Sequence, residues 1–182
     1  RVDNPVSLYA ATKRSDELLS ESYSSLYGLS QVGLRFFTVY GPWGRPDMAY
    51  WSFTRDIIEG KPIRVFNNGQ LERDFTYIDD IVSGVVATTL DQPAGGVPEL
   101  HRIYNIGNNR PVQLMRFIEI LEEAIGRKAE KIFETMQPGD VRATYANIDA
   151  LARDYGFAPT TRLEEGIPRF VDWYRGYTGA RA

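Results

Sequence analysis

Helical and strand-like segments alternate along the whole chain of 182 residues. Helices are indicated where apolar residues recur at spacings of three, four and seven and a glycine follows, as in 6–28, which ends at Gly28. Short apolar or β-branched runs between Gly- and Pro-containing turns indicate strands. Strands that alternate with helices favour parallel pairing, because a helix carries the chain back to the starting edge of the sheet. The alternation therefore predicts an α/β protein with mostly parallel strands.

The predicted elements follow one another without an internal repeat, a low-complexity segment or a long linker. The predicted helices are 6–28, 48–60, 80–90, 112–126, 148–155 and 163–176. The predicted strands are 31–37, 63–66, 73–78, 102–107 and 130–136, and the intervening loops and turns include 38–47, 67–70, 91–100 and 137–140. Asp79 is predicted to cap the helix 80–90, since Asp is a favoured N-cap residue. Length and organisation together predict one domain, or one and a fraction.

Composition excludes several classes of site. A net charge of −3 and a pI near 5.3 argue against nucleic acid or an anionic membrane as the main partner. The absence of cysteine excludes disulfides, thiolate catalysis and Cys-based metal sites, and it is compatible with a cytoplasmic location. The single histidine, His101, excludes a multi-His metal site, and no metal site is predicted. Since no apolar run approaches the roughly 20 residues of a membrane span, no membrane partner is predicted either.

A tyrosine and a lysine lie one helical turn apart near the start of the first predicted helix. Residues four apart share a helix face, so Tyr9 and Lys13 can point into one site. An isolated tyrosine, with a pKa of about 10, is a poor base at neutral pH, but a neighbouring ammonium stabilises the phenolate and lowers that pKa. The pair can then exchange a proton with a substrate hydroxyl. By itself the pattern is common by chance, and two ordinary surface residues explain it better.

Five blocks of sequence change that interpretation. They are NPVSLYAATKRSDELL, LRFFTVYGPWGRPDM, RVFNNGQLERDFTYIDDIVSGV, YNIG and QPGDVRATYANIDALARDYGFAPTTRLEEGI. In this order they resemble the second half of extended short-chain dehydrogenase/reductases, the NAD-dependent nucleotide-sugar epimerase/dehydratase family. The resemblance covers essentially the whole chain. The block FFTVYGPWGRPDMA is most similar to that of the UDP-glucuronate 4-epimerases.

The resemblance implies a particular fold. The chain is expected to form the C-terminal part of a Rossmann-type doubly wound sheet plus a small α/β substrate-binding domain. Residues 1–45 would be the remnant of the NAD-binding domain, and 46–182 would be mainly the substrate domain, with some segments returning to the Rossmann sheet. The glycine-rich dinucleotide fingerprint does not occur in this sequence. We therefore expect a C-terminal fragment that binds NAD weakly, is inactive alone and self-associates, for example as a homodimer.

The resemblance also assigns residues to the cofactor end of the site. Tyr9 would be the catalytic acid/base. Lys13 would be its electrostatic partner and would also hydrogen-bond the nicotinamide ribose of NAD. The chain after the strand GLRFF would run past the nicotinamide, which places Phe36 and Val39 against the cofactor.

The remaining assignments concern a UDP-sugar substrate. Thr38 stands where many relatives have an Asn that touches the sugar diphosphate, and Arg45 would reach the sugar carboxylate together with Thr38. The other assigned contacts are Arg64, Val65 and Phe66 at the uracil, Arg73 at the diphosphate, and Asp140 at the uridine ribose. Arginine suits these roles because its guanidinium matches carboxylate and phosphate oxygens bidentately. A weak surface pair between Arg73 and Asp74 is the alternative for Arg73.

The implied reaction is the NAD-dependent interconversion of UDP-glucuronate and UDP-galacturonate through a 4-keto sugar. Within the family, a 4,6-dehydratase or a decarboxylase fits the same residues. An inert sugar-nucleotide-binding fragment is the alternative from another class.

Overall fold

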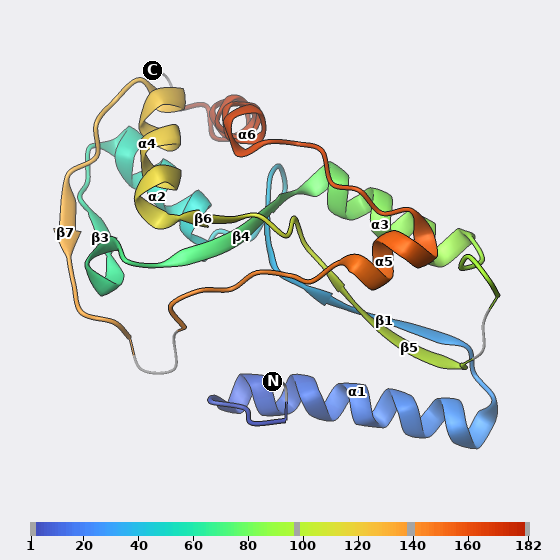
Figure 1. Cartoon of the computed structure of the whole chain (residues 1–182). Coiled ribbons are helices and arrows are strands. Elements are labelled where there is room, and N and C mark those ends of the chain that lie inside the picture. The colour runs from blue at the N-terminus through green and yellow to red at the C-terminus, as the bar shows by residue number, and fades with distance from the viewer. Residues whose placement is uncertain (1–2, 97–98, 138–140, 181–182) are drawn as a thin grey trace.

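The computed structural model describes residues 3–96, 99–137 and 141–180 (Figure 1). Its helices are α1 (Leu8–Tyr27), α2 (Ala49–Glu59), the 3₁₀ helix η1 (Phe66–Gly69), α3 (Ile78–Leu90), α4 (Leu114–Ile125), α5 (Asp149–Tyr155) and α6 (Leu163–Thr178). Its strands are β1 (Gln31–Phe36), β2 (Thr38–Tyr40), β3 (Ile63–Val65), β4 (Glu72–Tyr77), β5 (His101–Ile106), β6 (Pro111–Gln113) and β7 (Lys131–Phe133). The predicted α/β alternation is confirmed.

Pairing among the described strands is mostly parallel, as predicted. β1 pairs with β5 from Gln31↔His101 to Phe36↔Ile106. β2 pairs with β4, and β3 with β7, also in parallel. The antiparallel pair is β4 with β6, so the three-stranded sheet has the order β2-β4-β6.

The described residues form two apolar cores, one larger and one smaller. The larger is formed by α2, α4 and α6 with β2, β3 and β4, and Phe117, Ile118, Ile167 and Phe170 are completely buried in it. The smaller core lies between the pair β1–β5 and the helices α3 and α5. It consists of Ile81, Tyr104, Ile106, Leu151 and Phe157. In Figure 1, α1 lies on the opposite side of β1 and β5 from α3 and α5.

Helix α1 has well-defined ends. Its N-cap is Ser7, whose hydroxyl accepts a hydrogen bond from the Ala10 amide at 3.2 Å. Gly28 ends the helix in the left-handed conformation, with φ of 66°, and its amide donates to the Ser24 carbonyl. The surface of the helix carries six exposed apolar side chains: Leu8, Leu18, Leu19, Tyr23, Leu26 and Tyr27.

Several local predictions were wrong. Residues 38–40, predicted as loop, form β2, and 111–113 form β6 where the helix 112–126 was predicted to begin. The predicted cap at Asp79 is also wrong, because α3 begins at Ile78 directly after the strand and Asp79 lies inside its first turn. The neighbouring Asp80 is the buried carboxylate, and it accepts hydrogen bonds from the amides of Thr160 and Thr161 just before α6. The strand predicted at 130–136 is shorter, and only 131–133 pair.

A buried ion cluster fixes the end of α4 to β7. Glu122 is 4% exposed and accepts hydrogen bonds from Lys128 at 2.7 Å, from the Ala129 amide at 3.0 Å and from Lys131. Burial alone raises the pKa of Glu122, but the hydrogen bonds from Lys128, Lys131 and the Ala129 amide together lower it to about 2. A carboxyl whose pKa is lowered on folding stabilises the folded state when it is ionised.

Replacing Glu122 tests this contribution. Its stabilisation is complete above the unfolded pKa of 4.5 and is lost as the pH falls toward the folded pKa of about 2. We expect Glu122→Gln to lower the free energy of unfolding at pH 7 by about 2–3 kcal/mol. The variant should also lose less stability than the wild type between pH 5 and 2.

Urea unfolding at a series of pH values measures both effects. Glu123→Gln is the matched control, because the Glu123 side chain is 65% exposed and lies 3.8 Å from Arg116. An unfolding free energy with the same pH dependence in wild type and Glu122→Gln would contradict the assignment.

Candidate active site

Tyr9 and Lys13 line a groove of about 740 Å³ between α1 and the pair β1–β5. Phe36, at the end of β1, lines the same groove and is 53% exposed. The Tyr9 side chain is 72% exposed, so its phenol is accessible. The predicted sharing of one helix face by Tyr9 and Lys13 agrees with this geometry, and the structure adds Phe36 from the facing strand.

The Lys13 ammonium is engaged by a neighbouring carboxylate. Its Nζ donates to Asp16 Oδ2 at 2.7 Å. This hydrogen bond is the main reason why the pKa of Lys13 is raised above its ordinary value. The ammonium is therefore cationic at neutral pH, which is the form that stabilises a nearby phenolate.

An ion pair between Glu17 of α1 and Arg35 of β1 holds the helix against the strand. Glu17 receives two hydrogen bonds from Arg35, at 2.6 and 2.7 Å, and one from Arg14 at 2.8 Å. The hydrogen bond from Arg35 is the main reason why the pKa of Glu17 is lowered, to about 2. Burial alone would raise this pKa, and the hydrogen bond from Arg14 lowers it further. Because Glu17 lies one turn beyond Lys13, this cluster fixes the part of α1 that carries the Tyr–Lys pair.

Four of the predicted substrate residues meet in another pocket, of about 220 Å³. Thr38, Arg64, Phe66 and Arg73 line it. The register of the sheet explains part of this, since Thr38 pairs with Phe75, two residues after Arg73. The floor is apolar and includes Met48, Phe53, Leu71 and Leu114. These floor residues were not predicted as site residues, and an aromatic residue on a predicted helix, such as Phe53, indicates packing.

The arginines at this pocket make contacts with the protein. Arg64 donates to both carboxylate oxygens of Glu134, at 2.5 and 2.6 Å, and its guanidinium lies 5.2 Å from the centre of the Phe66 ring. Arg73 Nη1 donates to the carbonyls of Glu72 and Arg142, at 2.8 and 3.3 Å. Two cationic groups thus line the same pocket as several apolar side chains, which suits a ligand with a flat ring and an anionic group.

Arg45 lies beside this pocket. It belongs to the loop between β2 and α2, and its side chain is 73% exposed. Its guanidinium lies 3.4 Å from Asp47 Oδ2 and 3.4 Å from the Met48 sulfur, and Met48 lines the pocket. Arg45 therefore contacts a residue that lines the same pocket as Thr38 and Arg73.

Other predicted residues lie elsewhere. Val65 is 0% exposed and packs in the larger core, and its carbonyl accepts a hydrogen bond from the Glu134 amide at 2.9 Å, so the residue is covered on all sides. Val39 packs against the smaller core. Asp140 lies outside the described residues.

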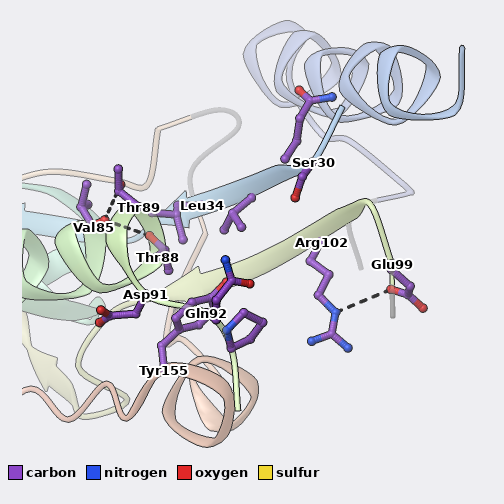
Figure 2. A pocket seen from close by; sticks show the side chains of 13 residues that line it. Ser30, Leu34, Val85, Thr88, Thr89, Asp91, Gln92, Glu99, Arg102 and Tyr155 are labelled. Atoms are coloured by element: carbon purple, nitrogen blue, oxygen red, sulfur yellow. Dashed lines mark hydrogen bonds and ion pairs between the residues drawn. The ribbon is translucent and has the colours of Figure 1, made fainter. Parts of the chain in front are cut away.

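A further cavity, of about 470 Å³, lies between β1, the end of α3 and α5 (Figure 2). Arg102 reaches into it and pairs with Glu99 at 3.8 Å and with Asp154 at 2.8 Å. Its lining residues are different from those predicted for the site.

Two classes of site have no candidate in the described part of the chain. Over 3–96, 99–137 and 141–180, acidic and histidine side chains form no group of three or more that could bind a metal ion. Among those same residues, every helix is too short or too polar to cross a membrane.

Comparison with known proteins places this geometry in a family. The family model described as NAD dependent epimerase/dehydratase family matches residues 1–107. Protein CapI of Staphylococcus aureus is 49% identical over 97% of this chain and 56% of its own length. UDP-glucuronate 4-epimerase 6 of Arabidopsis thaliana is 49% identical over 98% of this chain and 41% of its own length. This chain thus spans about half the length of the curated relatives it matches.

A solved structure shows the same fold. The UDP-glucuronic acid 4-epimerase of Bacillus cereus, in complex with UDP-glucuronic acid and NAD, superposes with a TM-score of 0.88 at 34% identity. The match covers 96% of this chain and 54% of that one. This likeness confirms the predicted fold class, in which the chain forms part of a Rossmann-type α/β structure. The chain belongs to the NAD dependent epimerase/dehydratase family.

Proposed function

We propose that the intact enzyme containing this chain is an NAD-dependent UDP-sugar 4-epimerase that interconverts UDP-glucuronate and UDP-galacturonate. One observation carries the proposal. Phe36 ends β1 in the groove of Tyr9 and Lys13, and Thr38 begins β2 in the pocket of Arg64 and Arg73. The end of β1 and the start of β2 follow one another in the chain, and they therefore connect the proton-transfer pair with the pocket that would bind the anionic groups. This arrangement suits a substrate whose reacting sugar lies between the two sites.

The groove has groups that suit the nicotinamide end of NAD. Lys13 supplies an ammonium donor for ribose hydroxyls, and Phe36 supplies an exposed aromatic surface. NAD, when bound, accepts and returns a hydride. The sequence has no glycine-rich turn for the pyrophosphate. We accordingly expect the 182-residue chain alone to bind NAD weakly and to be inactive.

The residues of this chain would divide the work on the substrate. Tyr9 removes and returns the proton of the sugar 4-hydroxyl, and the Lys13 ammonium stabilises the phenolate during that exchange. Arg73 binds the diphosphate, and Arg64 and Phe66, which flank the buried Val65 in the sequence, contact the uridine end. Arg45 and Thr38 bind the sugar carboxylate, and Asp140 remains the proposed contact to the uridine ribose. A cytoplasmic location also remains a prediction, based on the absence of cysteine.

We expect Tyr9→Phe to abolish turnover while substrate binding is retained, because the phenylalanine keeps the ring and loses the proton-transfer group. The loss in kcat should be at least about 10²- to 10⁴-fold. Steady-state assays with UDP-glucuronate measure kcat, and calorimetric titration with the sugar nucleotide measures binding. Product analysis of the wild type distinguishes an epimer from the products of a dehydratase or a decarboxylase. Retained turnover in Tyr9→Phe would exclude Tyr9 as the acid/base.

We expect the wild-type enzyme to prefer UDP-glucuronate to UDP-glucose in kcat/KM, and Arg45→Ala to lose most of that preference. The carboxylate forms a charge-assisted hydrogen bond that a hydroxymethyl group lacks, and such a bond is worth about tenfold to a hundredfold. Steady-state assays with both sugars measure the ratio. Arg55→Ala is the control, since Arg55 is a partly exposed arginine of α2 that pairs with Asp56. A loss of stability with an unchanged sugar ratio would mean that Arg45 only orders its loop.

We also propose that the chain self-associates through the exposed apolar surface of α1. Leu8 is 83% exposed, Leu26 73% and Tyr27 66%, which is unusual for a cluster of large apolar residues. Leu19→Glu with Leu26→Glu should shift the molar mass measured by light scattering toward the monomer at micromolar concentrations. Val82→Glu with Val86→Glu makes the same change at two exposed apolar residues of α3 and should not. A wild type that is monomeric throughout would overturn this proposal.

A further inference from the structure

The loop from Gly41 to Asp47 is restrained by close packing at its two glycines. Gly41 has φ of 138°, and a Cβ there would lie 2.6 Å from Ile78 Cγ2. A Cβ on Gly44 would lie 1.5 Å from the Tyr50 hydroxyl oxygen, and Tyr50 is buried in the larger core. The backbone of the loop therefore lies directly on the core at both positions.

Between these glycines, Trp43 adopts a left-handed conformation with φ of 62°. This conformation is unfavourable for a bulky residue and persists only where the surrounding structure holds it. The Trp43 ring packs edge-to-face against Trp173, with centroids 5.4 Å apart at 60°, and against Tyr177, at 5.5 Å and 75°. Edge-to-face contacts are the favoured geometry of aromatic pairs. Trp43 is 77% exposed, so these ring contacts with α6 are the packing that holds its backbone in this conformation.

The partners of Trp43 form a firm platform at the end of α6. Trp173 and Tyr177 stack with centroids 5.0 Å apart and planes 15° apart. Trp51 of α2 packs against both, at 5.5 and 6.2 Å. Trp51 also packs against Phe170, which is completely buried. The platform is therefore continuous with the larger core.

Arg45 follows Trp43 by two residues and has few contacts of its own. Its side chain is 73% exposed and touches Asp47 of the loop and Met48, the N-cap residue of α2. Surface contacts of this kind are weak. The path of the loop backbone, more than any packing of the side chain, decides where the guanidinium lies.

We propose that Trp43, docked on Trp173 and Tyr177, is a positioning residue that sets Arg45 for carboxylate recognition. The preference for a uronate would then depend on the last turns of α6, more than 120 residues beyond Arg45 in the sequence. This inference rests on the proposed function, because it assumes that Arg45 binds the sugar carboxylate. Trp43 itself is not assigned a contact with substrate.

The test compares Trp43→Ala, Trp43→Phe and Tyr177→Ala with wild type in the intact enzyme. The rate of amide hydrogen exchange in the peptide 41–48 measures how firmly the loop is held. The ratio of kcat/KM for UDP-glucuronate to that for UDP-glucose measures selectivity. Loss of one aromatic contact should speed exchange and lower the uronate preference about two- to tenfold. The change should arise in KM for UDP-glucuronate, with kcat for UDP-glucose unchanged. Trp43→Phe should restore most of both properties.

Tyr155→Ala is the matched control. It removes one edge-to-face aromatic contact, with Tyr104 at 5.6 Å and 85°, from the smaller core and leaves the platform of Trp43 intact. We expect it to lower the melting temperature without changing the selectivity. Equal losses of selectivity in Tyr155→Ala and Tyr177→Ala would overturn the proposal, as would faster loop exchange with unchanged selectivity, or no change in either.

Failure of the proposed function has a different signature. A wild type without uronate preference, or an Arg45→Ala variant that keeps it, would remove the role of Arg45 and this inference with it. A wild-type preference that depends on Arg45 but not on Trp43 or Tyr177 would overturn the inference alone. The outcome that supports both is loss of the preference in Arg45→Ala, Trp43→Ala and Tyr177→Ala with recovery in Trp43→Phe.

Discussion

The buried carboxylate of Asp74 joins the two cores of this structure. Asp74 is 0% exposed, and it accepts hydrogen bonds from the amides of Asn108, Asn109 and Ala146 at 2.8 to 2.9 Å. Burying a carboxylate is costly unless its oxygens are hydrogen-bonded, and here three amides from two distant segments do so. β4, which carries Asp74, belongs to the larger core, whereas Asn108 follows β5 of the smaller one. This contact therefore fixes the two cores to one another.

The geometry around Asp74 leaves little freedom for its neighbours. A Cβ on Gly107 would lie 3.0 Å from Asp74 Oδ2 and 2.7 Å from the Ala146 Cβ, so a larger residue would force the segments apart. Arg73 is adjacent to Asp74, and Thr38 pairs with the following Phe75. The pocket of Thr38 and Arg73 is consequently tied to the same contact that joins the cores. Its position relative to the groove of Tyr9 and Lys13 depends on how β1, paired with β5, leads into β2.

How much could be predicted from the sequence depended on whether the signal was local. Helix α1 and the shared face of Tyr9 and Lys13 follow from spacing and from the glycine that ends the helix, all within one segment. β2 and β6 were missed because each has three residues and exists through pairing with β4, whose register the sequence does not reveal. The cap at Asp79 failed because strand β4 leads into α3 without an intervening loop, so the N-cap position falls on Tyr77, the last residue of the strand.

The predicted pocket shows the same limit. Arg64, Phe66 and Arg73 came from the resemblance to a family, and the structure brings them together, whereas Val65 does not join them through its side chain. Side chains along a strand alternate between faces, and β3 has Ile63 and Val65 in the core with Arg64 outside. Which member of such a run meets the ligand is decided by the face of the strand. Sequence order alone does not give that face.

Ion pairs within the protein constrain any anionic ligand of the groove of Tyr9 and Lys13 or of the pocket of Arg64 and Arg73. Lys13 pairs with Asp16, Arg64 with Glu134 and Arg45 with Asp47, so each of these cations already has a carboxylate partner. A phosphate or carboxylate ligand must replace or share those partners, and its net gain is the difference between two ionic contacts in similar surroundings. That difference is smaller than the gross attraction and depends on geometry, which favours a ligand that satisfies a guanidinium bidentately. In a chain with a net charge of −3, recognition at this pocket therefore depends on placement of the arginines more than on their number.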